Sequence, residues 1–271
     1  MAPAELAFAE SGPGGAPTVV LLHGGGAAGW TWRPAVERLP EFHCLVPDLP
    51  DHAGSISSAG PFTMPTAVDA VIDLIRRRAH AGRTHVAGLS LGAQTLVALL
   101  ARMPEIVDRA LVSGALVHPL AGARWMHGLL ELTVRAYMPF RNFDGLVRAN
   151  AWGYGIPSAY LEAFREDTRL LTADSFLRIM AANLSFRLPE NLSAVPTPTL
   201  VLAGEREYGV MRRSARDLAA AMPHGHGAIV QGARHNWPLE QPDLFAEVLR
   251  AWVRSAPLPG RLIDIASVRR A

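Results

Sequence analysis

The stretch that decides the fold is Thr84–Met103, which reads THVAGLSLGAQTLVALLARM. Residues 84–87 predict a short buried strand, and residues 91–103 predict a helix that ends before a proline. The pentapeptide at 88–92, Gly-Leu-Ser-Leu-Gly, joins the two and has the pattern Gly-x-Ser-x-Gly. A strand, a sharp turn and a helix in this order indicate that Ser90 is lifted above the end of a sheet.

The turn at Ser90 has two consequences that favour nucleophilic chemistry. A serine on such a turn has a strained backbone, and flanking side chains would collide, so Gly88 and Gly92 are needed on either side. The turn also puts Ser90 at a helix N-terminus, where the N–H of Leu91 is free and the helix dipole favours negative charge. We therefore predict Ser90 as a nucleophile and the Leu91 N–H as a donor to an oxyanion. The alternative, an idle serine in a glycine-rich helix start, is disfavoured by the strand before it and the helix after it.

Apolar runs and amphipathic segments alternate on both sides of this stretch. The spacing implies an α/β fold, a mostly parallel central sheet flanked by helices. We expect residues 256–271 to form a tail that adds little to the core. Buried strands are predicted at 17–22, 43–47, 107–112, 199–203 and 228–231, and helices at 31–39, 66–79, 214–222 and 242–253.

The alternation stops between residues 116 and 192, where only helical segments separated by Pro and Gly are found. Ten of the 19 Phe, Tyr and Trp residues lie in this segment, together with Met126, Met138 and Met180. We predict that 116–192 is a helical cap over a site, and that 1–115 and 193–271 form the core. An ordinary helical layer with its own core is the alternative.

Composition excludes several classes of function. The formal net charge is only +2, so we expect no nucleic-acid partner. The chain has no lysine, which rules out a Schiff-base lysine and a P-loop lysine. Cys44 is the sole cysteine, and neither a secretory signal nor an apolar stretch of membrane-spanning length is found, so we expect a cytoplasmic protein without a membrane span. A homodimer is left open.

A glycine-rich loop, His23-Gly24-Gly25-Gly26, follows the first strong strand. Glycines allow close approach to another backbone and expose N–H groups. We predict that the Gly25 N–H is the second donor to the oxyanion, with Gly26 as the less favoured choice. His23 is interpreted as structural, holding the loop by a side-chain hydrogen bond.

A serine hydroxyl needs a base to take its proton. Of the ten histidines, His235 follows the last predicted core strand and precedes the closing helix, where a base could reach Ser90. An acid must orient that base, and Glu207 lies on the loop after the strand at 199–203. Glu205 is the runner-up for the acid and Asp48 an outside alternative.

These motifs, taken in order, resemble the α/β-hydrolase superfamily of single-domain esterases and related enzymes. The resemblance runs from Pro17 to Trp252 and includes the chain order Ser90, Glu207, His235. In two places the chain departs from the family, which usually has Asp where Glu207 stands and Gly-His-Gly where residues 51–54 read Asp-His-Ala-Gly. The second departure predicts a changed loop beside the pocket.

The resemblance implies hydrolysis of a carboxylic ester or lactone through an acyl-enzyme, with no metal and no organic cofactor. The aromatic cap predicts a small, apolar substrate. The same triad also serves C–C bond hydrolases, hydroxynitrile lyases and cofactor-free perhydrolases, and sequence does not separate these reactions. A non-catalytic ligand receptor is a third hypothesis, which the complete candidate triad disfavours.

Overall fold

The computed structural model describes residues 5–119 and 123–267, except for the side chains of residues 123–127 and 129. Met126, which the sequence placed in the apolar cap, is among the side chains outside the described part. None of the helices in the described ranges is long and apolar enough to cross a membrane.

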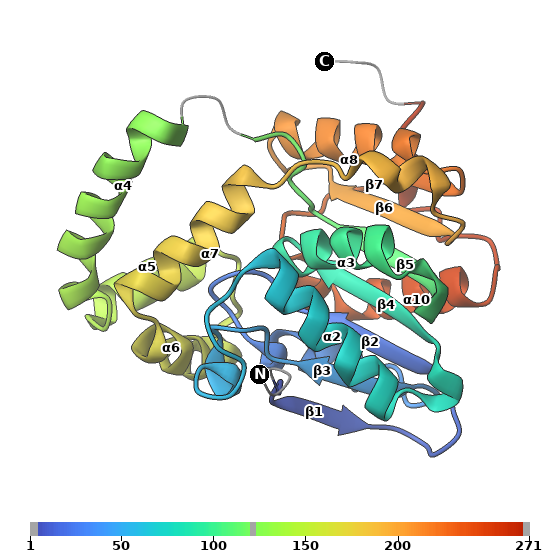
Figure 1. Ribbon diagram of the computed structural model, residues 1–271, viewed down its shortest axis with the longest axis horizontal. Coiled ribbons are helices and arrows are strands. Elements are labelled where there is room, and N and C mark those ends of the chain that lie inside the picture. Colours follow the sequence, from blue (N-terminus) through green and yellow to red (C-terminus); the bar gives the residue numbers. More distant parts are fainter. Residues whose placement is uncertain (1–4, 120–122, 268–271) are drawn as a thin grey trace.

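Within the described ranges, eight strands form one sheet in the order β1-β3-β2-β4-β5-β6-β7-β8 (Figure 1). The six central strands are parallel to one another, whereas β1 and β8 pair antiparallel at the two edges. The predicted α/β fold with a mostly parallel sheet is confirmed. The strands are β1 Phe8–Ser11, β2 Thr18–Leu22, β3 His43–Pro47, β4 Thr84–Leu89, β5 Val107–Ser113, β6 Thr199–Gly204, β7 Gly225–Val230 and β8 Leu262–Asp264.

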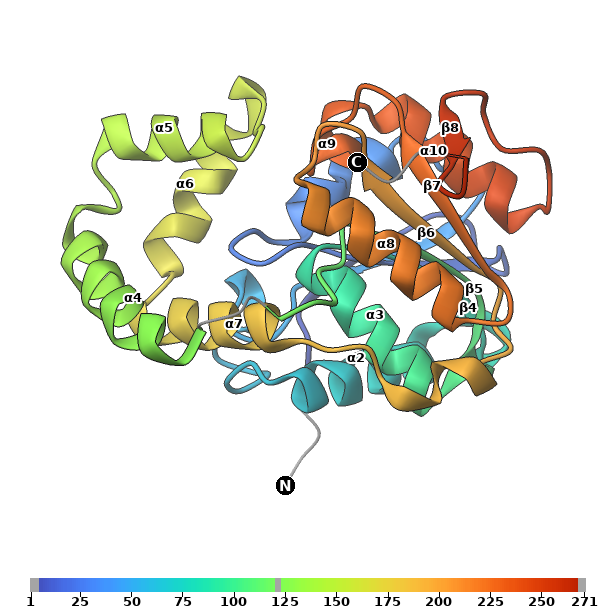
Figure 2. The same cartoon turned by 90° about the horizontal axis from the view of Figure 1, so that it is seen from above.

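Helices cover both faces of the sheet, which is why the central strands are apolar on both sides (Figure 2). Val20 and Leu22 of β2 pack with α2, α3 and α8 on one face, whereas Val19 and Leu21 pack with α1 and α10 on the other. The core helices are α1 Arg33–Val36, α2 Met64–Arg78, α3 Leu91–Arg102, α8 Gly209–Ala221, α9 Trp237–Glu240 and α10 Pro242–Val253.

The prediction for the C-terminal residues is wrong. Residues 262–264 form β8, which pairs antiparallel with β7, and Ile265 is buried beside it. The first strand, β1, was also missing from the prediction. Both are short edge strands without a fully buried residue, so neither carries the long apolar run by which the central strands were recognised.

Between β5 and β6 the described residues contain helices and no strand, as predicted. These helices stand to one side of the sheet in both views, with α4 farthest from it and α7 closest (Figures 1 and 2). Large apolar side chains remain exposed here, among them Phe140, Phe143 and Trp152. The helices are α4 Ala123–Tyr137, α5 Asp144–Gly153, α6 Leu161–Leu170 and α7 Ala173–Ser185.

Candidate active site

The turn between β4 and α3 holds Ser90 in the strained conformation that its sequence predicts. Ser90 has φ 54° and ψ −113°, and its N–H donates to the Ser113 carbonyl at 2.9 Å. A Cβ on Gly88 would lie 2.5 Å from the Gly92 carbonyl oxygen, and one on Gly92 would lie 2.3 Å from that of Leu22. Only glycine fits at both positions, so the neighbouring backbones enforce the turn.

The helix that follows this turn begins at Leu91. The Gln94 N–H donates to the Ser90 carbonyl at 3.0 Å, which completes the first helical turn. The Leu91 N–H has no intrahelical acceptor, because the first N–H groups of any helix lack one. A negative charge beside Ser90 would therefore meet this N–H and the positive end of the helix dipole.

The glycine loop at 23–26 lies directly against this turn. A Cβ built on Gly24 would be 3.5 Å from Ser90 Cβ, and one on Gly25 would be 3.5 Å from Leu91 Cδ2. The Gly26 N–H is engaged, because it donates to His52 Nε2 at 3.2 Å. Among the described residues, none accepts from the Gly25 N–H. This arrangement agrees with the preference for Gly25 over Gly26 as the donor to an oxyanion.

Two buried histidines hold the peptide groups on either side of Gly25. His23 Nδ1 donates to the Gly24 carbonyl at 2.8 Å, and its Nε2 accepts the Leu49 N–H at 2.9 Å. The loop-holding role predicted for His23 is confirmed. His52 Nδ1 donates to the Pro50 carbonyl at 2.8 Å, which leaves its Nε2 to accept from Gly26.

Burial keeps both imidazoles neutral, and only a neutral ring can donate at one nitrogen and accept at the other. Desolvation lowers the pKa of His23 to about 4 and that of His52 to about 3. The bond from Gly26 to His52 crosses 26 residues, so no local pattern in the sequence predicts it.

His235 and Glu207 meet where the loops after β7 and β6 run side by side. His235 Nδ1 lies 2.9 Å from Glu207 Oε1, and the Glu207 side chain is only 2% exposed. In the described part of the chain, Glu207 Oε2 has no hydrogen-bond partner. Glycine is required at Gly114, which has φ 64° and whose added Cβ would come within 2.8 Å of His235 Cε1.

The two alternative acids, Glu205 and Asp48, accept hydrogen bonds from backbone N–H groups of other loops. Glu205 Oε2 accepts the Gly232 N–H at 2.7 Å. Asp48 accepts from the Gly29 N–H at 2.8 Å and from the Gly54 N–H at 3.0 Å. Both carboxylates therefore fix loops, and Glu207 is the acid that the structure pairs with His235.

Ser90 and His235 line the same pocket, which is open to solvent and has a volume of about 490 Å³ when its solvent-filled opening is counted. Its wall combines the glycine loop with apolar side chains of the helical segment. Tyr154, Ile156 and Phe164 come from that segment, and Leu89 comes from β4. Such a pocket suits a ligand that places an apolar group against these side chains and a polar group near Ser90.

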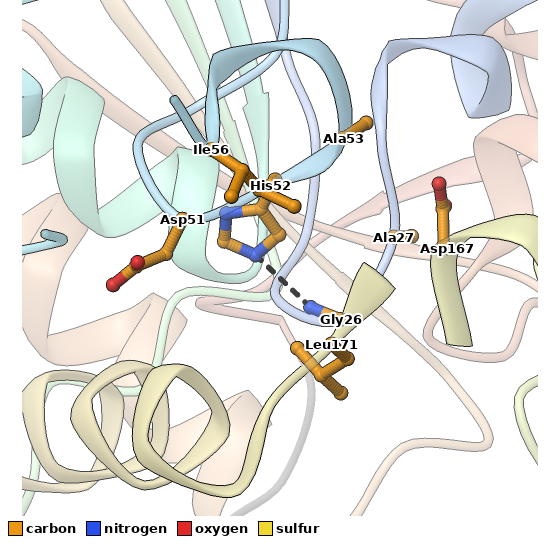
Figure 3. Close-up of a pocket in the computed structure, with 8 residues that line it drawn as sticks. All are labelled: Gly26, Ala27, Asp51, His52, Ala53, Ile56, Asp167 and Leu171. Carbon is orange, nitrogen blue, oxygen red and sulfur yellow. Dashed lines mark hydrogen bonds between the residues drawn. The ribbon is translucent and has the colours of Figure 1, made fainter. Parts of the chain in front are cut away.

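A second, smaller pocket of about 220 Å³ adjoins the first and shares Gly26 and Ala27 with it. Figure 3 shows the imidazole of His52 turned toward Gly26, whereas the carboxylate of Asp51 points away from the glycine loop. Asp51 and Ala53 have φ of 64° and 36°, so residues other than glycine adopt a left-handed backbone here. The altered loop predicted for residues 51–54 stays a prediction.

Asp167 of α6 also lines the second pocket and was not identified from the sequence. Its Oδ2 accepts from Trp30 Nε1 at 2.6 Å, which ties α6 to the core. Burial raises the pKa of Asp167 to about 7, against the lowering effect of the Trp30 bond. In the ranges that the structure describes, no group of three or more His, Cys, Asp or Glu residues is placed to hold a metal ion.

Comparisons with known proteins agree with this architecture. The model of the alpha/beta hydrolase family matches residues 19–248. An AB hydrolase superfamily protein of Gibberella zeae is 28% identical over 266 residues, covering 93% of this chain and 85% of its own. A pimeloyl-[acyl-carrier protein] methyl ester esterase of Xanthomonas campestris is 26% identical, covering 90% of this chain and 98% of its own.

Solved structures share the fold at lower identity. An enol-lactonase of Burkholderia xenovorans superposes with a TM-score of 0.74 at 22% identity, covering 92% of this chain and 96% of its own. An esterase of Exiguobacterium antarcticum reaches a TM-score of 0.76 at 16% identity, covering 92% and 95%. At these identities the likeness establishes the fold alone.

Proposed function

Because the chain belongs to the alpha/beta hydrolase family, we propose that it hydrolyses a carboxylic ester or lactone with an apolar substituent. Ser90, His235 and Glu207 act as nucleophile, base and acid. The observation that carries the proposal is the hydrogen bond between His235 Nδ1 and Glu207 Oε1, because His235 lines the same pocket as Ser90. A buried carboxylate on Nδ1 leaves Nε2 as the basic nitrogen of a neutral imidazole.

In the first step, Ser90 Oγ attacks the carbonyl carbon while His235 Nε2 takes the hydroxyl proton. The carbonyl oxygen becomes an oxyanion that accepts from the N–H groups of Gly25 and Leu91. The imidazolium that forms is stabilised by Glu207. The C–O bond to the leaving group then breaks, and His235 gives its proton to the departing alkoxide.

In the second step, water attacks the acyl group on Ser90. His235 takes a proton from the water and returns it to Ser90 Oγ as the acyl–oxygen bond breaks. The products are a carboxylic acid and an alcohol, or one hydroxy acid when the substrate is a lactone. Each donor to the oxyanion contributes about 3–4 kcal/mol to the transition state.

The substrate class follows from the wall of the pocket. Tyr154, Ile156 and Phe164 line the pocket together with the glycine loop, and such apolar side chains favour an apolar acyl or alcohol group. The ester and lactone names of the relatives agree with this class. Residues 116–192 act as a cap that supplies this lining, and 1–115 with 193–271 act as the catalytic core. Cytoplasmic location and a homodimer stay predictions.

A panel of short aryl esters and small lactones, assayed with wild type and Ser90→Ala, tests the proposal. Wild type should turn over at least one ester, and Ser90→Ala should lose about 10³-fold or more in kcat while its thermal unfolding is unchanged. Ser58→Ala is a matched control, because Ser58 is exposed and its hydroxyl donates to the Glu5 carbonyl. Full turnover by Ser90→Ala would disprove the nucleophile assignment.

A further inference from the structure

Helix α7 contacts the glycine loop at Gly25 and also the neighbouring loop at Asp51. Ile179, which is 2% exposed, packs directly on Gly25, because a Cβ added to Gly25 would lie 3.1 Å from Ile179 Cγ2. The preceding residue, Arg178, binds Asp51 through two hydrogen bonds, Nε to Oδ2 at 3.0 Å and Nη2 to Oδ1 at 2.9 Å. Such a two-bond pair fixes orientation as well as distance.

Asp51 is held on its other side by the core, since its Oδ2 also accepts the Phe62 N–H at 2.7 Å. Its side chain is only 8% exposed, whereas that of Arg178 is 41% exposed. Burial by itself would raise the pKa of Asp51, but Arg178 and the Phe62 N–H bring it below its ordinary value. Asp51 is therefore ionised at neutral pH, and the removal of Arg178 would leave a buried carboxylate without its counter-charge.

The segment that Arg178 grips is strained. Asp51 and Ala53 both have positive φ, and His52 lies between them. Such conformations persist only where surrounding contacts hold them. His52 in turn accepts the Gly26 N–H at 3.2 Å and holds that peptide toward its own ring (Figure 3). A continuous set of contacts thus runs from α7 through Asp51 and His52 to the glycine loop.

We propose that Arg178 is a positioning residue, which orients the Gly25 N–H toward the oxyanion by fixing Asp51 and His52 when α7 is seated on the core. Donors to an oxyanion act only when their direction is set before the reaction. Release of Arg178 would relax the 51–53 segment, free the Gly26 N–H and misdirect the adjacent Gly25. The kinetic consequence rests on the proposed function, whereas the structural consequence does not.

The test compares Arg178→Gln with Arg135→Gln. Arg135 is a matched control because it also binds α7, through Asp174 at 2.9 Å, but does not reach the glycine loop. We expect Arg178→Gln to lower kcat about 10- to 100-fold on an aryl ester with KM changed less than about twofold. Arg135→Gln should stay within about twofold of wild type in both. Asp51→Asn should resemble Arg178→Gln, and the double variant should be no worse than either single one.

Amide hydrogen exchange on the same proteins gives a readout that does not require catalysis. Exchange at Gly26 should accelerate at least about tenfold in Arg178→Gln and stay unchanged in Arg135→Gln, while β4 remains protected in both. Unchanged Gly26 exchange, or a fall in kcat equal to that of the control, would overturn the proposal and leave the proposed function standing. Faster Gly26 exchange in a protein whose wild type cleaves no ester or lactone would support the coupling and overturn the proposed function.

Discussion

Replacement of Asp167 by Asn should stabilise the protein, and the gain should depend on pH. Asp167 is a partly buried residue of α6 and accepts a hydrogen bond from the Trp30 indole N–H. Burial raises the pKa of its carboxyl from 3.8 to about 7. Asn has the same size and can still accept the Trp30 bond, but it carries no charge to desolvate.

The magnitude follows from proton linkage. The folded state binds more protons than the unfolded state between pH 3.8 and about 7, so wild-type stability falls as the pH rises through this window. At about 1.36 kcal/mol per pKa unit the full cost above pH 7 is about 4 kcal/mol. Relaxation and residual solvent contact reduce this to about 2 kcal/mol. The Asn variant should be more stable than wild type by about 2 kcal/mol at pH 8, and by almost nothing at pH 4.

Thermal unfolding of both proteins between pH 4 and pH 9 measures this difference. A gain of about 2 kcal/mol corresponds to about 4–8 °C in Tm for a domain of this size. Glu166→Gln is the matched control, because Glu166 is the exposed neighbour on the same helix, and its effect should stay below about 0.5 kcal/mol. The reasoning would be refuted if the Asn variant were no more stable than wild type at pH 8, or if its advantage were the same at pH 4.

Two further substitutions test separate parts of the account. Glu207→Gln should lower kcat about 10²- to 10⁴-fold in steady-state kinetics, because an amide does not enforce the His235 tautomer in which Nε2 is the base. Glu205→Gln is the control and should retain most activity, because Gln can still accept the Gly232 N–H. Equal losses in the two variants would contradict the acid assignment. Ile265→Ala should lower the free energy of unfolding, measured in urea, by about 2–4 kcal/mol, because it removes a buried side chain that packs on Gly227 next to β8. A decrease below about 0.5 kcal/mol would show that this C-terminal segment adds little to the core.

The central sheet could be predicted because its strands are buried on both faces. A strand such as β2, with all five residues buried, leaves a continuous apolar run in the sequence. The edge strand β1 has one partly buried residue and three exposed ones, and the three residues of β8 include none that is fully buried. The pairing of β1 and β8 depends on backbone hydrogen bonds to one neighbouring strand. Most residue types can make such bonds, so no sequence pattern predicts these two strands.

The meeting of Glu207 with His235, and the pocket shared by His235 and Ser90, could be predicted for a related reason. Ser90, Glu207 and His235 each follow a recognisable parallel strand, and the carboxyl ends of parallel strands meet at one edge of a sheet. The pair of Asp51 and Arg178 spans 127 residues and joins a loop to α7. Its formation depends on how the helical segment docks on the core. Asp51 follows the end of β3 closely, but Arg178 lies on a helix with no strand-end motif beside it, so the sequence offers no pattern that connects the two.

Capture of the acyl-enzyme tests the central claim most directly. Wild-type protein is mixed with an excess of a slowly deacylating aryl ester, quenched within the first turnover, digested and examined by mass spectrometry. We expect a burst of the aryl alcohol close to one equivalent and a single acyl group on the peptide that contains Ser90. The account would be contradicted if the protein gave a burst but carried the acyl group on another residue. It would also be contradicted if the ester were hydrolysed while Ser90 stayed unmodified.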